Sequence, residues 1–190
     1  MQQIDYSSYF WQNDLIRLRA MTAEDWEQSY LNMFDSDARR VLQYEIELPP
    51  TINGEKKAIE QFCEFNPASK RLMFSIENKQ NELVGALNIN SINERNGTFS
   101  IGMQIDRNCR SKGYGTAAMK KLLQYAFYER RLNKYNGSVL EGNIASLKML
   151  EKLGVQIEGT RRQNVFTNGK YTNEILVGLT KEDFENKFPR

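Results

Sequence analysis

The sequence contains no histidine, only two cysteines and only four prolines in its 190 residues. Without histidine, the chain has no Ser-His-Asp or Cys-His nucleophile system, no histidine metal site and no imidazole base. Cys63 and Cys109 lack the CxxC spacing of zinc and redox motifs, so we expect two ordinary thiols and no metal site. Any catalysis must therefore use carboxylate, hydroxyl, water or backbone groups.

Long apolar runs and an excess of one charge are also missing. No apolar run approaches the roughly 20 residues of a membrane span, and the first residues do not form a signal peptide. The 26 basic and 24 acidic residues nearly balance, which argues against a basic surface for DNA or an anionic membrane. We expect a cytoplasmic protein without DNA or membrane partners, folded as one domain over residues 1–190.

The order of apolar segments and turns predicts the fold class. Three apolar segments between residues 71 and 105, separated by the polar turns NKQNE and NERNG, predict an antiparallel meander. Helices are predicted over residues 22–34, 54–65, 116–131 and 143–153, and further strands over 15–20, 134–141, 155–162 and 171–179. This order predicts an α/β fold with a mixed sheet of about seven strands flanked by helices.

The stretch RSKGYG at residues 110–115 places two glycines beside an arginine and a lysine, just before a predicted helix. Such a turn leaves backbone N–H groups free, and the helix adds about half a positive charge at its N-terminus. The stretch therefore predicts an anion site. It is not a P-loop, because no GxxxxGK followed by Ser or Thr occurs.

A dinucleotide fold is a further interpretation of the same glycines. GYGTAA at residues 113–118 satisfies GxGxxA, and Glu141 lies near the end of the next predicted strand, where a ribose-binding acid is expected. Against this interpretation, six polar residues separate the strand from the first glycine, and an antiparallel meander precedes them.

Read together with its arginine, the stretch is an R-x-x-G-x-G motif that other motifs follow. These are N-x-x-S at residues 143–146, LEKLG at 150–154 and the closing GKYTNEILVGL. The chain resembles the GNAT superfamily of acetyl-CoA-dependent N-acetyltransferases, most closely its RimJ/RimL-like branch. The resemblance implies a mostly antiparallel GNAT-like sheet and direct acetyl transfer from acetyl-CoA to an amine. The expected acceptor is a protein N-terminus or a small-molecule amine, with a polyamine as an alternative, and a homodimer stays open.

The resemblance also assigns residues to coenzyme A. Its pyrophosphate is expected on the glycine stretch, formed by Arg110, Ser111, Lys112, Gly113, Tyr114, Gly115 and Thr116. Gln104 and Ile105 are expected to offer strand backbone to the pantetheine arm, and Asn143 to hold the pantetheine or the substrate end. A doubly charged diphosphate suits free N–H groups, a helix N-terminus and two nearby cations.

The catalytic groups are less well defined by the motifs. The tyrosine that serves many family members as general acid is replaced by Leu150, which leaves Ser146 as the nearest candidate to meet the leaving thiolate. Where family members often have a glutamate before the I-G of the fourth strand, this chain has Ser100. Glu141 and Glu174 are the candidate bases, and water relayed to a carboxylate is equally consistent.

The motifs leave two questions open: whether the chain is catalytic, and which amine it accepts. Without the tyrosine and the glutamate, a catalytically silent module that binds coenzyme A for regulation stays open beside the enzyme. Acceptor specificity is expected in residues 35–54 and in the turn at 166–169, where Glu45 and Glu47 of the first segment would attract a cationic amine.

Overall fold

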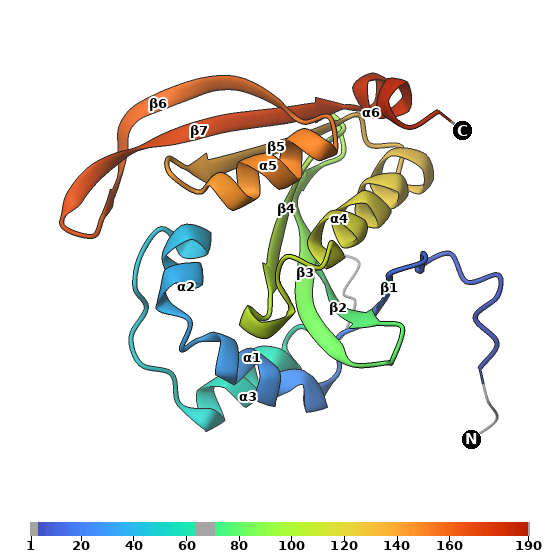
Figure 1. Cartoon of the computed structure of the whole chain (residues 1–190), viewed down its shortest axis with the longest axis horizontal. Helices are drawn as coiled ribbons and strands as arrows, with labels where there is room; N and C mark the ends of the chain where they lie inside the picture. Colours follow the sequence, from blue (N-terminus) through green and yellow to red (C-terminus); the bar gives the residue numbers. More distant parts are fainter. Residues whose placement is uncertain (1–3, 64–70, 190) are drawn as a thin grey trace.

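A computed structural model describes residues 4–63 and 71–189. These residues form a seven-stranded sheet in the order β1-β2-β3-β4-β5-β7-β6, which confirms the predicted α/β class (Figure 1). Neighbouring strands are antiparallel except for β4 and β5, which are parallel. The strands are β1 (Ile16–Ala20), β2 (Leu72–Asn78), β3 (Leu83–Asn93), β4 (Thr98–Ile105), β5 (Lys134–Leu140), β6 (Gln156–Thr167) and β7 (Lys170–Thr180).

The helices agree with the predictions in part. They are α1 (Trp26–Asn32), α2 (Ser36–Gln43), α3 (Ile52–Glu60), α4 (Tyr114–Gln124), α5 (Ile144–Lys152) and α6 (Lys181–Lys187). A 3-10 turn, Ala23–Asp25, precedes α1, and a π-helical turn, Tyr125–Glu129, follows α4. The prediction missed α2 and α6, and residues 64–65 of the helix predicted over 54–65 lie outside the described residues. No helix among the described residues is both long and apolar enough to cross a membrane.

The side chains of β4 alternate between two layers of helices. A Cβ atom on Gly115 of α4 would lie 3.2 Å from Met103 Cε and 3.4 Å from Ile105 Cγ1. Gln104, between these two residues, instead donates a hydrogen bond of 3.4 Å to the Asn32 carbonyl of α1. Thus α4 covers one face of β4 and α1 the other, and a core of fully buried residues lies on the α4 face: Phe99, Met119, Leu122, Leu123, Phe127 and Phe184.

The strands β4 and β5 pair only where they begin. Thr98 pairs with Lys134 and Phe99 with Tyr135, and beyond these two pairs the strands run apart (Figure 1). β5 keeps its regular pairing with β7, while β4 keeps its pairing with β3. The dinucleotide interpretation is wrong, because the strand before the glycines lies in an antiparallel meander rather than in an all-parallel sheet.

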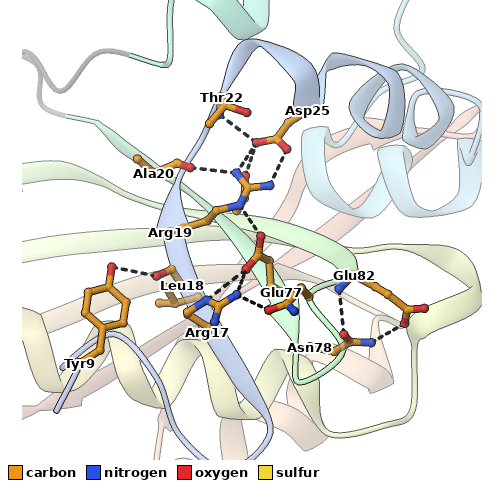
Figure 2. A network of polar contacts seen from close by, with 12 residues as sticks. Tyr9, Arg17, Leu18, Arg19, Ala20, Thr22, Asp25, Glu77, Asn78 and Glu82 are labelled. Carbon is orange, nitrogen blue, oxygen red and sulfur yellow. Dashed lines mark hydrogen bonds and ion pairs between the residues drawn. The ribbon is translucent and has the colours of Figure 1, made fainter. Parts of the chain in front are cut away.

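A network of charged side chains fixes the first strands of the sheet (Figure 2). Glu77 of β2 accepts from Arg17 Nη2 and from Arg19 Nε, each at 2.6 Å. Arg19 also contacts Asp25 at 2.7 Å, and the Ser75 hydroxyl donates to the same carboxylate at 2.7 Å. Both carboxylates are buried, so the network satisfies charges that would otherwise destabilise the fold.

This network predicts a specific pH dependence of stability. Burial raises the pKa of Asp25, but hydrogen bonds from Arg19, Thr22 and Ser75 outweigh burial, and the pKa is lowered. With a folded pKa below the unfolded value of about 3.9, Asp25 stabilises the fold above that pH and loses this contribution as the pH falls further. The Asp25→Asn variant should therefore melt below the wild type at pH 7, with the difference shrinking towards pH 3. Thermal melts across this range test it, and a constant difference would contradict it.

Candidate active site

The divergence of β4 and β5 produces a cavity of about 520 Å³ between them. Its wall includes Ser100 and Met103 of β4, Ser138 of β5, and Asn143 and Ser146 of α5. Because the two strands belong to one sheet, an opening between them connects the helix layer on one face with the layer on the other. The cavity therefore gives two molecules access to each other from opposite faces.

A second cavity, of about 470 Å³, lies between α1, α2, α3 and the strands β2, β3 and β4. Four residues line both cavities, so the two adjoin: Leu42, Asn90, Gly102 and Met103. A Cβ atom at Gly102 would lie 2.8 Å from Asn88 Nδ2, so a side chain at this position would crowd the junction. The second cavity thus leads from the layer of α1, α2 and α3 to the opening between β4 and β5.

The glycine stretch forms the N-terminus of α4 and has the geometry of an anion site. Gly113 is the N-cap residue with φ of 85°, and Ser111 also has a left-handed backbone, with φ of 63°. Alternation of this kind turns successive N–H groups towards one concave side. The first N–H groups of α4 have no acceptor within the helix, so Tyr114, Gly115 and Thr116 offer three donors.

The two glycines have different structural roles. Gly113 requires the left-handed conformation that glycine adopts at little cost. Gly115 is required for close packing, because a Cβ atom there would lie 3.2–3.4 Å from Met103, Ile105 and Met149. A substitution at Gly115 would therefore disturb the contact of α4 with β4 and α5 as well as any bound anion.

Arg110 is paired within the protein. Its Nη2 contacts Asp35 Oδ2 at 2.6 Å, and its Nε donates to the Ile105 carbonyl at 3.0 Å. Burial raises the pKa of Asp35, but hydrogen bonds from the Ala38 N–H and from Arg110 outweigh burial and lower it. Arg110 thus joins the glycine stretch to α2, and Lys112 is the exposed cation of the stretch without an ion pair among the described residues.

Within residues 4–63 and 71–189, the edge of β4 that faces β5 has no strand partner beyond Phe99. Gln104 and Ile105, predicted to offer backbone to the pantetheine arm, lie on this part of the strand. The side chain of Gln104 points to the face of the sheet covered by α1 and α2, where Arg39 Nη1 of α2 donates a hydrogen bond of 3.1 Å to it. The backbone edge, rather than the Gln104 side chain, is therefore the group that the opening presents.

Asn143 and Ser146 lie together at the start of α5. Asn143 is the N-cap, and its Oδ1 accepts from the Ser146 N–H at 3.2 Å, which confirms the predicted helix start. Both residues line the opening, as does buried Leu150 one turn further along the helix. Among the described residues the Ser146 hydroxyl has no hydrogen-bond partner, so this group is available to contact a bound molecule.

The two candidate carboxylates have different surroundings. Glu141 is exposed beyond the end of β5, accepts from Asn173 Nδ2 at 3.0 Å and does not line the opening. Glu174 is only 6% exposed and accepts from Arg161 at 3.1 Å and Asn164 at 2.8 Å. Burial raises the pKa of Glu174, but hydrogen bonds from Ser138, Arg161 and Asn164 outweigh burial and lower it, so Glu174 is ionised at neutral pH.

Sequence reasoning missed one pair of residues at the opening. The Tyr44 hydroxyl lies 2.8 Å from Ser138 Oγ, and both side chains line the cavity. Tyr44 ends α2 in a left-handed conformation, with φ of 68°, which is rare for a tyrosine. The two residues are 94 positions apart, and no motif marks either of them.

Comparison with known proteins identifies the family to which this geometry belongs. The family model described as "Acetyltransferase (GNAT) domain" matches residues 16–156, about three quarters of the chain. The chain belongs to the GNAT acetyltransferases. The GNAT fold accounts for the open seven-stranded sheet, and the predicted fold is confirmed.

Three relatives illustrate the range of similarity. YokL of Bacillus subtilis, an uncharacterized N-acetyltransferase from the SPbeta prophage, is 28% identical over 178 residues, covering 93% of this chain and 96% of YokL. YdaF of the same species, named as a candidate ribosomal N-acetyltransferase, is 28% identical over 127 residues, 67% of each chain. The structure of Vibrio cholerae spermidine N-acetyltransferase with CoA and spermine has a TM-score of 0.79 at 19% identity, over 90% of this chain and 99% of that one, a likeness in fold.

This GNAT protein is therefore an N-acetyltransferase that takes its acetyl group from acetyl-CoA and transfers it to an amine. The opening between β4 and β5 is lined by residues from both faces of the sheet. An anion site at the start of α4 suits the diphosphate of the donor.

Proposed function

We propose that this GNAT protein binds acetyl-CoA on the α4 and α5 face of the sheet and acetylates an amine that enters from the α1–α3 face. The observation that carries this proposal is the opening between β4 and β5. It brings the start of α5, with Ser146, into the same cavity as Tyr44 at the end of α2 and Ser138 of β5. The neutral amine nitrogen then attacks the acetyl carbon within the opening, where the new C–N bond forms and the C–S bond breaks. Coenzyme A leaves as the thiolate, and the proton that the nitrogen loses passes to water or to that thiolate.

The donor side follows from the free backbone groups. We assign the diphosphate to the N–H groups of residues 111–116, with Lys112 as the cation beside it. The pantetheine arm runs along the unpaired edge of β4 at Gln104 and Ile105 towards Asn143 and Ser146. Arg110 fixes this loop through its ion pair with Asp35, which partly neutralises the positive charge that it could offer to the diphosphate.

This donor site predicts that Lys112→Glu raises the KM for acetyl-CoA about tenfold, because a charge-assisted contact is replaced by repulsion of a dianion. The effect should shrink at high salt, since Lys112 is exposed. Lys79→Glu makes the same charge change at an exposed residue between β2 and β3 and should leave KM unchanged. Steady-state kinetics at two salt concentrations measure both, and equal values for the two variants would contradict the assignment.

Two acceptor classes are supported to different degrees. The YdaF likeness and the RimJ/RimL-like motifs favour a protein N-terminal amine. The Vibrio neighbour acts on spermidine and favours a polyamine. On the acceptor side, Glu47 is paired with Arg39 at 2.6 Å, so its charge is no longer available to attract a cationic amine. Glu55 lines the second cavity, next to α1–α3, and among the described residues its carboxylate accepts a hydrogen bond only from Ser29.

A panel of amines tests the proposed function. Purified protein is incubated with acetyl-CoA and, separately, with spermidine, spermine, aminoglycosides and peptides that begin with different residues, while thiol release is followed. Amine-dependent thiol release with an acetylated product by mass spectrometry is expected for one class. If acetyl-CoA raises the melting temperature but no amine is acetylated, the silent regulatory module is the better description.

A further inference from the structure

The cavity between β4 and β5 contains a chain of polar side chains that begins at the end of α2, on the face of the sheet opposite α4 and α5. Tyr44 Oη lies 2.8 Å from Ser138 Oγ. Ser138 lies in turn beside Glu174, close enough to help lower the pKa of that carboxyl group. The register supports this contact, because Leu140 pairs with Glu174 and Ser138 pairs with Leu176, which places Ser138 and Glu174 as diagonal neighbours on one face. The chain therefore runs from the cavity to a buried carboxylate.

The buried charge sets the direction of every hydrogen bond in this chain. The Glu174 carboxylate is acceptor-only when ionised, and Arg161 and Asn164 both donate to its Oε2. Glu174 acts on both hydroxyls, because burial and this carboxylate together raise the pKa of Tyr44. The protons of Ser138 and Tyr44 therefore point towards the carboxylate side of the chain, away from the cavity. With its only proton directed towards Ser138 and Glu174, the Tyr44 oxygen presents lone pairs to the cavity.

On this basis, and resting on the proposed acetyltransferase function, we propose that Tyr44 contacts the acceptor amine and that Ser138 and Glu174 hold its hydroxyl in the accepting orientation. An amine nitrogen carries N–H donors, which match the lone pairs that Tyr44 presents. The contact would leave the nitrogen lone pair free to point at the acetyl carbon. Ser138 and Glu174 act through Tyr44 and are positioning residues.

The backbone of Tyr44 supports a functional role for this side chain. A left-handed conformation at a residue other than glycine, asparagine or aspartate is unfavourable, and such residues are concentrated at functional sites. The conformation ends α2 and brings the phenol into the cavity, where it lines the same wall as Ser138. The Arg110–Asp35 pair anchors the start of the same helix to the glycine stretch, so the helix that carries Tyr44 is fixed at its other end.

The Tyr44→Phe variant tests the contact with an acetylatable amine from the panel. It removes the hydroxyl and keeps the ring, so kcat/KM for the amine should fall about tenfold while the KM for acetyl-CoA stays unchanged. Tyr9→Phe is the matched control, because the Tyr9 hydroxyl contacts the Leu18 carbonyl, away from the cavity. Wild-type values for Tyr44→Phe would overturn the proposal, whereas absence of acetylation in the wild type would instead overturn the proposed function and the inference with it.

Two further variants separate positioning from packing. Ser138→Ala should lower kcat/KM for the amine less than Tyr44→Phe does, and it should add nothing in the Tyr44→Phe background, because both act through one hydroxyl.

Glu174→Gln should lower kcat/KM for the amine further than Tyr44→Phe does. Its carbonyl would take the Arg161 and Asn164 donors, and its NH₂ would face Ser138 and Tyr44, which would turn the Tyr44 proton towards the amine. Additive effects of Tyr44→Phe and Ser138→Ala, or wild-type kinetics of Glu174→Gln, would contradict the chain. The melting-temperature shift caused by acetyl-CoA shows in each variant that the donor site is intact.

Discussion

Replacing Glu77 by alanine should lower the free energy of unfolding by about 3–5 kcal/mol, the loss expected when one partner is removed from a buried ion pair. Glu77 is the hub of the network in Figure 2, because Arg17 and Arg19 both contact its carboxylate at 2.6 Å. Both guanidinium groups would keep their charge, since arginine does not deprotonate in proteins. Arg19 would retain Asp25, whereas Arg17 would retain uncharged partners, the Asn81 amide and the Tyr6 ring, with no carboxylate among the described residues.

Glu94→Ala is the matched control for this prediction. Glu94 also contacts an arginine at 2.6 Å, but its side chain is 65% exposed. Exposed ion pairs contribute at most about 1 kcal/mol and weaken with salt. Urea unfolding at low and high salt should therefore show a large, salt-insensitive loss for Glu77→Ala and a small, salt-sensitive loss for Glu94→Ala. Equal losses would mean that the network does not stabilise the sheet.

Much of the fold could be predicted because the relevant signals are local. The polar turns between residues 71 and 105 divide the meander, and β2 ends, β3 begins and ends, and β4 begins within a few residues of them. Asn143 was expected to start a helix, and it accepts the hydrogen bond of an N-cap. Two helices were missed although their caps are visible in the sequence: Asp35 caps α2 and Thr180 caps α6. The first of these caps stands at the start of residues 35–54, where we predict a specificity segment and no helix.

Motifs predict some of the residues that line the cavity, whereas contacts that depend on long-range packing leave no local signal in the sequence. The start of α4 and the residues of α5 at the opening follow from the R-x-x-G-x-G and N-x-x-S motifs. The Arg110–Asp35 pair spans 75 positions, and nothing in the local sequence indicates that this arginine is engaged by α2. Likewise, Glu141 and Glu174 were equivalent candidates from the sequence, and only the burial of Glu174 and its link to Ser138 distinguish them.

Ser146→Ala should lower kcat by roughly tenfold to a few hundredfold, with little change in the KM for acetyl-CoA. The backbone N–H of Ser146 is already engaged by Asn143, so the substitution removes only the hydroxyl from the opening and leaves the cap intact. A hydroxyl has too high a pKa to give up a full proton readily, but it can donate a hydrogen bond to the sulfur as negative charge develops there. This interaction exists mainly in the transition state, which is why the loss should appear in kcat.

The control for this variant is the unfolding temperature, which should stay close to that of the wild type because the cap uses the Asn143 side chain and the Ser146 backbone. Single-turnover measurements with saturating acetyl-CoA separate the chemical step from product release. An unchanged chemical rate would show that Ser146 has no role beyond the first turn of α5.

The converse variant, Leu150→Tyr, is made in the Ser146→Ala background. Leu150 lies one turn beyond Ser146 on α5 and lines the same opening, so a phenol at this position would extend into the cavity from the same face of the helix. Because Leu150 is buried, the variant needs the acetyl-CoA melting shift as evidence that the donor site is preserved. With the shift preserved, kcat should recover by at least tenfold, since a phenol with a pKa near 10 donates to a leaving thiolate more readily than an aliphatic hydroxyl does. A preserved shift without recovery would place the departing sulfur away from α5, and the role proposed for Ser146 would then be wrong.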